Sequence, residues 1–329
     1  MTTTILQVEN LVVEFKVNQD RVRAVDDVSL ELRAGELVGL VGESGSGKST
    51  LAYAMMNLLP RQGRLVSGKI ALATVGDISR WSEPDMSRVR GNRISMVFQA
   101  TQSTFNPIRT LESQFKLLFR AHGINVQEGL IKARRLLQRT QLDPQRILTS
   151  YPHQLSGGMR QRVGIVFAMV LEPDVILLDE PTTALDVLSQ RVVLDLIRDL
   201  RSQTDAAMLF ITHDFSVVSN LSQRIGVMYA GKLVELAPTE RLYRFPQHPY
   251  TALLTRAVPS ISQKHTELVG IPGQPPHLSD LPPGCRFSPR CPYVQERCRE
   301  RTPPWSKISA DQGVACFRWS ELGEELANV

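Results

Sequence analysis

Long apolar segments are missing from this sequence of 329 residues. No stretch approaches the roughly 18 to 20 uncharged apolar residues with which a helix spans a bilayer. The first residues, Met1-Thr2-Thr3-Thr4, also lack the basic and apolar regions of a secretory signal peptide. The sequence therefore predicts a cytoplasmic protein with no membrane segment of its own.

Blocks of one charge are missing as well. The chain holds 38 Lys and Arg against 33 Asp and Glu, a net charge of +5, and the two signs are interspersed. Such a mixture is typical of an ordinary solvated surface, whereas nucleic-acid-binding proteins gather their basic residues on one face. We therefore expect no nucleic acid as a partner. The length predicts one large domain with an appendage.

Cysteine is scarce, and all four cysteines lie near the end of the chain, at Cys285, Cys291, Cys298 and Cys316. Thirteen of the 20 prolines fall between Pro238 and Pro304, which predicts irregular structure there. Clustered thiols in a reducing compartment indicate a structural metal site that holds the irregular chain together, rather than disulfides. The close Cys-x2-Cys pairs of zinc sites are absent, so the spacing favours an iron-sulfur cluster, with zinc or free buried thiols as alternatives.

A glycine-rich loop is the dominant feature of what the sequence does contain. Residues 42–50 read Gly-Glu-Ser-Gly-Ser-Gly-Lys-Ser-Thr between two apolar segments, the order strand, loop and helix of a phosphate-binding loop. Bare backbone N-H groups and a helix N-terminus attract phosphate, Lys48 reaches the β and γ phosphates, and Ser49 is the expected magnesium ligand. The predicted nucleotide contacts are Gly42, Ser44, Gly45, Ser46, Gly47, Lys48, Ser49 and Thr50.

Two further strands are predicted to end in chemically useful side chains. The apolar run 175–178 leads into Asp179 and Glu180, which suit a magnesium-linked role and the polarisation of an attacking water, with a helix cap as the alternative. The apolar run 208–211 leads to His213, which we expect to contact a γ-phosphate because its strand should lie beside that of Asp179.

Three other positions extend this prediction. Gln99 ends the strand 94–98, where open α/β sheets place ligand contacts. Ser156-Gly157-Gly158 precedes an apolar helix and forms a second anion cradle, which one phosphate site does not need. Phe15, on the strand 6–17, suits stacking on an adenine ring, and a core position is the alternative. A second short strand is expected at 28–32.

Together these motifs resemble the nucleotide-binding subunit of an ABC transporter over about residues 5–245. Gly42 to Ser49 match the Walker A motif, Gln99 the Q-loop, Leu155 to Gln161 the signature motif, Val175 to Glu180 Walker B, Ala184 to Asp186 the D-loop and His213 the H-loop. The resemblance implies an α/β P-loop fold with a RecA-like core, an antiparallel β subdomain and a helical subdomain. It also implies an ATPase with Glu180, His213, Gln99 and Lys48 as catalytic residues.

The resemblance further implies how ATP and magnesium are bound. Two cassettes pair head to tail, so that Ser156, Gly157 and Gly158 of one contact ATP held by the other, with Asp186 at the junction. Phe15 stacks on adenine, and Ser49, Gln99 and Asp179 serve the magnesium ion. The second cassette is a copy of this chain or a paralogue.

A closer resemblance lies beyond the core. Segments 245–254 and 281–292 look like the C-terminal region of oligopeptide, dipeptide and nickel importer ATPases, of the D type. This implies peptide import through two membrane permeases fed by an extracytoplasmic solute-binding protein, with nickel or another small solute as the alternative. It also implies a [4Fe-4S] cluster on the four cysteines. Ala100 and Glu112 depart from the family pattern and bear on coupling to the permeases.

The expected organisation follows from this resemblance. Residues 1–240 form the ATPase domain, with the helical subdomain at about 100–165, and residues 241–329 form an irregular, cysteine-bearing accessory region. The protein is expected on the cytoplasmic face of the inner membrane. A soluble ABC ATPase acting on nucleic acid is a less favoured alternative because no coiled-coil insertion or second cassette is visible, and an exporter ATPase is disfavoured by the C-terminal region.

Overall fold

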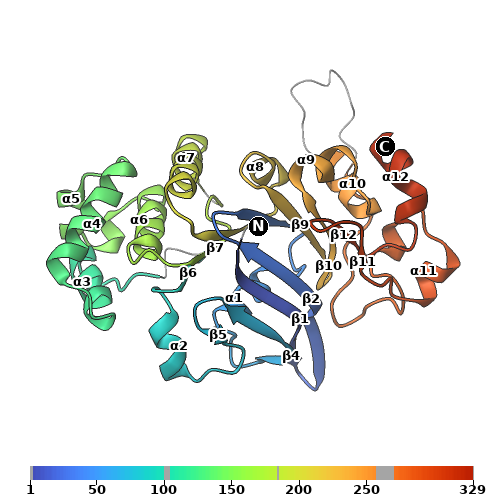
Figure 1. The fold of residues 1–329 in the computed structure, drawn as a ribbon, viewed down its shortest axis with the longest axis horizontal. Helices are drawn as coiled ribbons and strands as arrows, with labels where there is room; N and C mark the ends of the chain where they lie inside the picture. The colour runs from blue at the N-terminus through green and yellow to red at the C-terminus, as the bar shows by residue number, and fades with distance from the viewer. Residues whose placement is uncertain (1–2, 100–103, 184, 257–269, 329) are drawn as a thin grey trace. The chain divides into compact units, whose positions relative to one another are not determined.

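The computed structural model describes residues 3–99, 104–183, 185–256 and 270–328. Contacts divide the chain into two compact units, whose helices and strands are labelled in Figure 1. Unit 1 comprises Met1–Leu6, Leu32–Glu36 and Arg80–Leu209, and unit 2 comprises Gln7–Glu31, Leu37–Ser79 and Phe210–Val329. Among the described residues, no helix combines the length and the apolar character needed to cross a bilayer.

A four-stranded sheet forms one part of unit 2. Its strand order is β2-β1-β4-β5, with β1 at Thr4–Val17, β2 at Asp20–Arg33, β4 at Gly63–Leu72 and β5 at Gly76–Asp77. The predicted start of the second strand at Val28 is wrong, because β2 begins eight residues earlier. Val22 and Ala24 are buried while Arg21 and Arg23 are exposed, and this alternation extends the strand through its charged residues.

The second sheet of unit 2 joins the phosphate-loop strand to the C-terminal region. β3 (Leu37–Val41) pairs in parallel with β9 (Arg224–Tyr229), and β9 pairs antiparallel with β10 (Lys232–Pro238). β12 (Gly313–Val314) adds to β10, and β11 (Ser306–Lys307) adds to β12. The C-terminal region therefore extends the sheet that carries the loop, as Figure 1 shows around β10.

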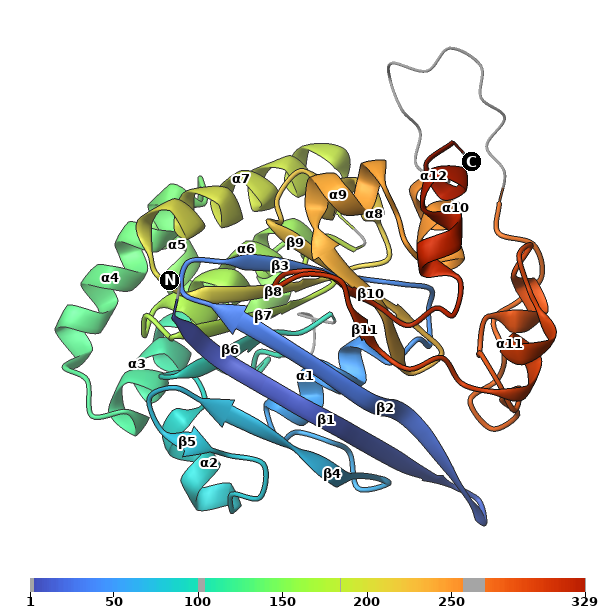
Figure 2. The same ribbon diagram turned by 45° about the vertical axis from the view of Figure 1, so that its right-hand side comes forward.

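Short helices complete unit 2. They are α1 (Lys48–Met55), α8 (Phe215–Ser219), α9 (Thr239–Arg244), α10 (Pro249–Arg256), the 3-10 turn η3 (Ser288–Arg290), α11 (Glu296–Glu300) and α12 (Trp319–Asn328). Figures 1 and 2 both place α12 beside α10, where Ala252 packs with Leu322 and Leu326. Among its described residues, the region predicted as irregular thus contains only short elements, held by contacts with one another and with β10.

Unit 1 contains a parallel strand pair and a group of helices. β6 (Ile94–Val97) pairs with β7 (Val175–Asp179), and β8 (Ala207–Ile211) follows β7 in the strand order. All five residues of β7 are buried, as the continuous apolar run predicted. The helices are α2 (Glu83–Val89), α3 (Leu111–Ala121), α4 (Val126–Arg139), α5 (Pro144–Thr149), the 3-10 turn η2 (Pro152–Gln154), α6 (Gly157–Met169) and α7 (Val187–Gln203).

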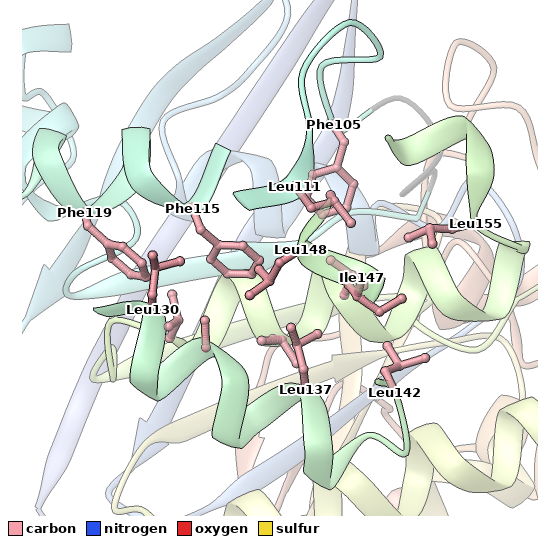
Figure 3. Close-up of a cluster of buried hydrophobic side chains, with 14 of the residues drawn as sticks. Phe105, Leu111, Phe115, Phe119, Leu130, Leu137, Leu142, Ile147, Leu148 and Leu155 are labelled. Carbon is pink, nitrogen blue, oxygen red and sulfur yellow. The ribbon is translucent and has the colours of Figure 1, made fainter. Parts of the chain in front are cut away.

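The helices α3 to α6 surround an apolar core of their own. On α4, Leu130, Ala133 and Leu137 recur at helical spacing and are buried against Phe115 and Phe119 of α3 (Figure 3). Burial of each large side chain stabilises the fold by about 1.5 to 3 kcal/mol. This core holds the start of α6, which carries the predicted signature residues.

Candidate functional site

The phosphate-binding loop lies between β3 and α1 in unit 2. Gly47 caps α1 with a φ of 100°, and an added Cβ there would lie 2.2 Å from the Ala24 carbonyl oxygen. A Cβ at Gly42, whose φ is 151°, would lie 2.1 Å from the Met228 carbonyl oxygen. Glycine is therefore required at both positions by backbone packing and dihedral angle together.

The outer rim of the loop is open. Ser44 and Gly45 are exposed, and among the described residues no heavy atom lies within 4 Å of a Cβ built on Gly45. α1 begins directly behind this rim, so its first N-H groups, which have no partners within the helix, belong to the same loop. An open rim backed by a helix N-terminus fits a phosphate group.

Lys48 is folded back against the loop. Its side chain is nearly buried, and Nζ donates to the carbonyl oxygens of Gly42 at 2.7 Å and Glu43 at 2.9 Å and to Ser46 Oγ at 3.2 Å. The ammonium charge is thus fixed at the loop by its own backbone. Ser49 and Thr50 follow in the first turn of α1, both half-buried.

Phe15 and His213 are the other predicted residues of unit 2. Phe15 is half-buried on β1, and its ring lies so close to Gly63 that a Cβ there would be 2.9 Å from Cε1. His213 is exposed just after β8. The next residue, Asp214, caps α8 by accepting from Ser216 N at 2.9 Å, so that carboxylate has a local structural role.

Unit 1 brings together Gln99 and Glu180, which are 81 positions apart. Gln99 Nε2 donates to Glu180 Oε2 at 2.8 Å, and Thr183 Oγ1 donates to the same oxygen at 2.8 Å. Glu180 has a φ of 46°, a left-handed conformation that is uncommon outside glycine and is frequent at functional sites. The neighbouring Asp179 is fully buried at the end of β7.

Thr183 is a contact that sequence reasoning missed. The signal was available, because a threonine three positions after a carboxylate in a turn is placed to return a hydrogen bond to it. The two donors fix one oxygen of the Glu180 carboxylate. Ala100 and Ala184, which the sequence analysis singled out, lie outside the described residues.

The predicted signature residues begin α6. Ser156 caps the helix, with Oγ accepting from Met159 N at 3.3 Å, and Gly157 and Gly158 form its first turn. A Cβ on Gly158 would lie 2.8 Å from Ser189 Oγ, so glycine permits the close approach of α7. The residues of the predicted anion cradle thus also form the N-terminal cap of α6.

Asp186 caps α7 beside this signature turn. Its carboxylate accepts from Ser189 N at 2.9 Å and from Ser189 Oγ at 2.7 Å, and these hydrogen bonds lower its pKa. The next two side chains, Val187 and Leu188, are apolar and yet 81% and 78% exposed. An exposed apolar pair beside the signature is typical of a contact surface.

The four cysteines, all half-buried, line one cavity in unit 2 together with Phe287 and Leu322. Burial, with a smaller contribution from the neighbouring thiols, raises the pKa of Cys291 to about 11 and of Cys316 to about 12. The sulfurs are thus close enough to influence one another. As placed, however, no three His, Cys, Asp or Glu side chains of the described residues are arranged to hold a metal ion.

Known proteins match both parts of the chain. A family profile described as ABC transporter matches residues 25–183, and one described as oligopeptide/dipeptide transporter, C-terminal region, matches residues 234–298. A putative peptide import ATP-binding protein of Brucella abortus strain 2308 is 41% identical over 97% of this chain and 98% of its own length. The chain belongs to the ATP-binding proteins of peptide ABC transporters.

Two further proteins support this assignment for the ABC ATPase. The dipeptide transport ATP-binding protein DppD of Caldanaerobacter subterraneus is 38% identical over 96% of this chain and 98% of its own length. A dimeric ATP-binding cassette, solved in a post-hydrolysis state with ADP and phosphate, shares the fold with a TM-score of 0.64 and 25% identity. The structural match covers 71% of this chain and 98% of the cassette. The predicted ABC fold and ATPase activity are thereby confirmed.

Proposed function

We propose that this ABC ATPase hydrolyses ATP to power the import of di- and oligopeptides through a membrane complex. The observation that carries the proposal is the union, in one chain, of the phosphate-binding loop with a C-terminal region that matches the oligopeptide/dipeptide profile. The relatives named as peptide and dipeptide transport proteins align over nearly their whole length. Nickel, a different solute or a nucleic acid is less favoured because these relatives are named for peptide and dipeptide transport.

Each predicted site residue has a role in this proposal. Lys48 neutralises the β and γ phosphates, Glu180 polarises the attacking water, and His213 contacts the γ-phosphate. The magnesium ion is held by Ser49, Asp179 and Gln99. The remaining nucleotide contacts are Phe15, Gly42, Ser44, Gly45, Ser46, Gly47 and Thr50. Support comes from the hydrogen bonds that fix the Lys48 ammonium and the Glu180 carboxylate.

We propose that the working form is a head-to-tail dimer with a second copy or a paralogue. Ser156, Gly157, Gly158 and Asp186 then complete the site of the partner. The exposed apolar pair Val187 and Leu188 beside Asp186 supports a contact surface there. The structurally similar cassette is also dimeric.

The partners in the membrane are two permeases, which an extracytoplasmic solute-binding protein supplies, and the ATPase docks on their cytoplasmic side. We propose that residues 1–240 form the ATPase domain, with its helical subdomain at about 100–165, and that residues 241–329 form an accessory region.

The four cysteines are proposed to hold a [4Fe-4S] cluster, with zinc as the alternative. The shared cavity supports the proposal, because thiols that line one space meet the donor requirement of either metal. The raised pKa of Cys291 and Cys316 means that binding must displace protons from these thiols. The side chains must also move closer to hold a single ion.

The transport assignment is tested with proteoliposomes that contain the permeases, with the ATPase and ATP enclosed inside and the solute-binding protein added outside. ATP-dependent uptake of a labelled tripeptide is expected, and uptake of nickel at the same rate is not. Nickel uptake without peptide uptake would overturn the peptide assignment and leave the ATPase assignment intact.

The cluster is tested by anaerobic purification, which should give a brown protein with about four irons and four sulfides per chain. A colourless protein with one zinc per chain would overturn the cluster and support the zinc alternative.

A further inference from the structure

Within unit 2, one arginine of the cysteine-bearing segment 281–316 contacts the phosphate-binding loop directly, and another contacts residues that support it. Arg290, which precedes Cys291, forms a bidentate ion pair with Glu43, the second residue of the loop. The distances are 2.7 Å from Nη1 to Oε2 and 2.9 Å from Nη2 to Oε1, and the Arg290 side chain is 5% exposed. Such a fork geometry is specific as well as strong.

Arg290 is itself rigidly held. Its Nε donates to the Pro272 carbonyl oxygen at 2.8 Å, and Nη1 donates to Tyr229 Oη at 3.2 Å. The guanidinium carbon also lies 5.8 Å from the centre of the Tyr229 ring. The guanidinium therefore has one defined position, and its ion pair fixes the position of the Glu43 carboxylate as well.

Glu43 is held at its backbone by the same region. Its N-H donates to Tyr250 Oη at 3.0 Å, and Tyr250 packs against Tyr229 and Phe287 with ring centres 4.6 and 5.3 Å apart. The Glu43 carbonyl oxygen in turn accepts from Lys48 Nζ at 2.9 Å. A continuous path of contacts thus runs from Arg290 through Glu43 to the lysine of the loop.

Arg286, which follows Cys285, supports the loop along a second path. It donates to the Asp26 carboxylate and to the Ala230 carbonyl oxygen. The adjacent Gly231 N-H donates to the Ser46 carbonyl oxygen at 2.9 Å. Arg286 and Arg290 therefore both act on residues that shape the loop.

The charge of Glu43 decides what this arrangement does. A carboxylate beside a phosphate cradle repels the anion that the loop binds, and the repulsion is strong where water is largely excluded. Arg290 neutralises that carboxylate by the bidentate pair, while the rim at Ser44 and Gly45 stays exposed. Without Arg290, the charge of Glu43 is uncompensated next to the phosphates.

We propose that Arg290 is a positioning residue for ATP binding, which acts through Glu43 by fixing the loop and cancelling its negative charge. The proposal rests on the proposed ATP site, and it assigns the C-terminal region a direct part in nucleotide affinity. Tyr250 is the second anchor of the same loop residue.

The test is a double-mutant cycle on the purified full-length protein, with a fluorescent ATP analogue and magnesium as the probe. Arg290→Met should weaken binding about tenfold, because a buried charged partner is lost. Glu43→Gln should weaken binding less than Arg290→Met does. The double variant should regain most of the affinity that Arg290→Met alone loses. In ATPase assays KM for ATP should rise while kcat changes less than about twofold.

Arg297→Met is the matched control, because Arg297 lies in the same segment but pairs with Glu321 at 3.0 Å on an exposed surface. It should bind like the wild type. If Arg290→Met does not fold, Arg290→Lys and Tyr250→Phe remove parts of the same contacts and should weaken binding about threefold. Wild-type affinity in folded Arg290→Met, or no recovery in the double variant, would overturn the proposal. Failure of the wild type to bind would instead refute the proposed ATP site.

Discussion

The phosphate-binding loop and the cysteine-bearing segment 281–316 both gather polar groups on irregular chain, but they are built in opposite ways. The loop is made by consecutive residues, and Lys48 reaches carbonyl groups only five and six positions away. The cysteine-bearing segment depends on distant partners, and Arg290 meets Glu43 across 247 positions. A site formed by local backbone is therefore visible in a sequence, whereas one formed by long-range contacts is visible only in the fold.

The largest expected effect tests whether the locally encoded motifs carry out the chemistry. Glu180→Gln should lower kcat about a thousandfold, because a neutral amide does not act as the base toward water. Gln retains a side-chain oxygen that accepts from Gln99, so the local structure and ATP binding should persist. Steady-state ATPase assays and binding of the fluorescent ATP analogue separate the two effects.

Glu172→Gln is the matched control for this prediction. Glu172 is an exposed glutamate that precedes β7 and pairs with Lys132 at 2.9 Å, a contact of the kind that contributes little. Its kcat should equal that of the wild type. If the kcat of Glu180→Gln were within tenfold of the wild-type value, a residue other than Glu180 would have to be the base. The motifs that are visible in the sequence would then not account for the chemistry.

An intermediate effect is expected from acid at the start of the C-terminal region. Burial lowers the pKa of His248 to about 3, and its Nδ1 accepts from Tyr250 N at 3.0 Å. The neutral form is therefore favoured in the folded state, and its stability contribution is lost as pH falls from about 6.5 towards 3. The stability advantage of the wild type over His248→Gln should shrink by about 2 kcal/mol between pH 6.5 and 4.5.

The prediction concerns the difference in unfolding free energy between the wild type and His248→Gln, because Glu235 changes the stability of both proteins with pH in the opposite direction. Burial raises the pKa of Glu235 to about 7, so its contribution is lost as pH rises from about 4.5 to 7. Urea unfolding of the wild type and of His248→Gln at each pH cancels this shared contribution. The exposed His153→Gln variant should show no such change, and a constant difference for His248→Gln would contradict the prediction.

How much the sequence predicted follows the same division. The strand β7 and the loop 42–50 were predicted because burial period and turn chemistry act over a few residues. The start of β2 was missed because charged residues on that strand hide its alternation. Arg286 and Arg290 were visible only as residues beside cysteines, and no local rule pairs them with Asp26 and Glu43.

The smallest expected effect separates backbone strain from phosphate recognition. Gly45 has a φ of 77° and Gly35 a φ of 65°, and at neither position does a built Cβ meet a described heavy atom within 4 Å. Alanine at either position should therefore cost about 1 kcal/mol of stability through the dihedral angle alone. Thermal unfolding of the two variants should give nearly the same shift.

ATP binding should distinguish the two glycines although their stabilities match. Gly45 lies on the exposed rim of the loop, where an added methyl group occupies space that a phosphate approaches, so Gly45→Ala should weaken binding about fivefold. Gly35 lies outside the loop, in the turn between β2 and β3, and Gly35→Ala should bind ATP as the wild type does. Equal affinities for both variants would mean that the rim at Gly45 is not where phosphate binds, and the locally encoded site would then have to be placed deeper in the loop.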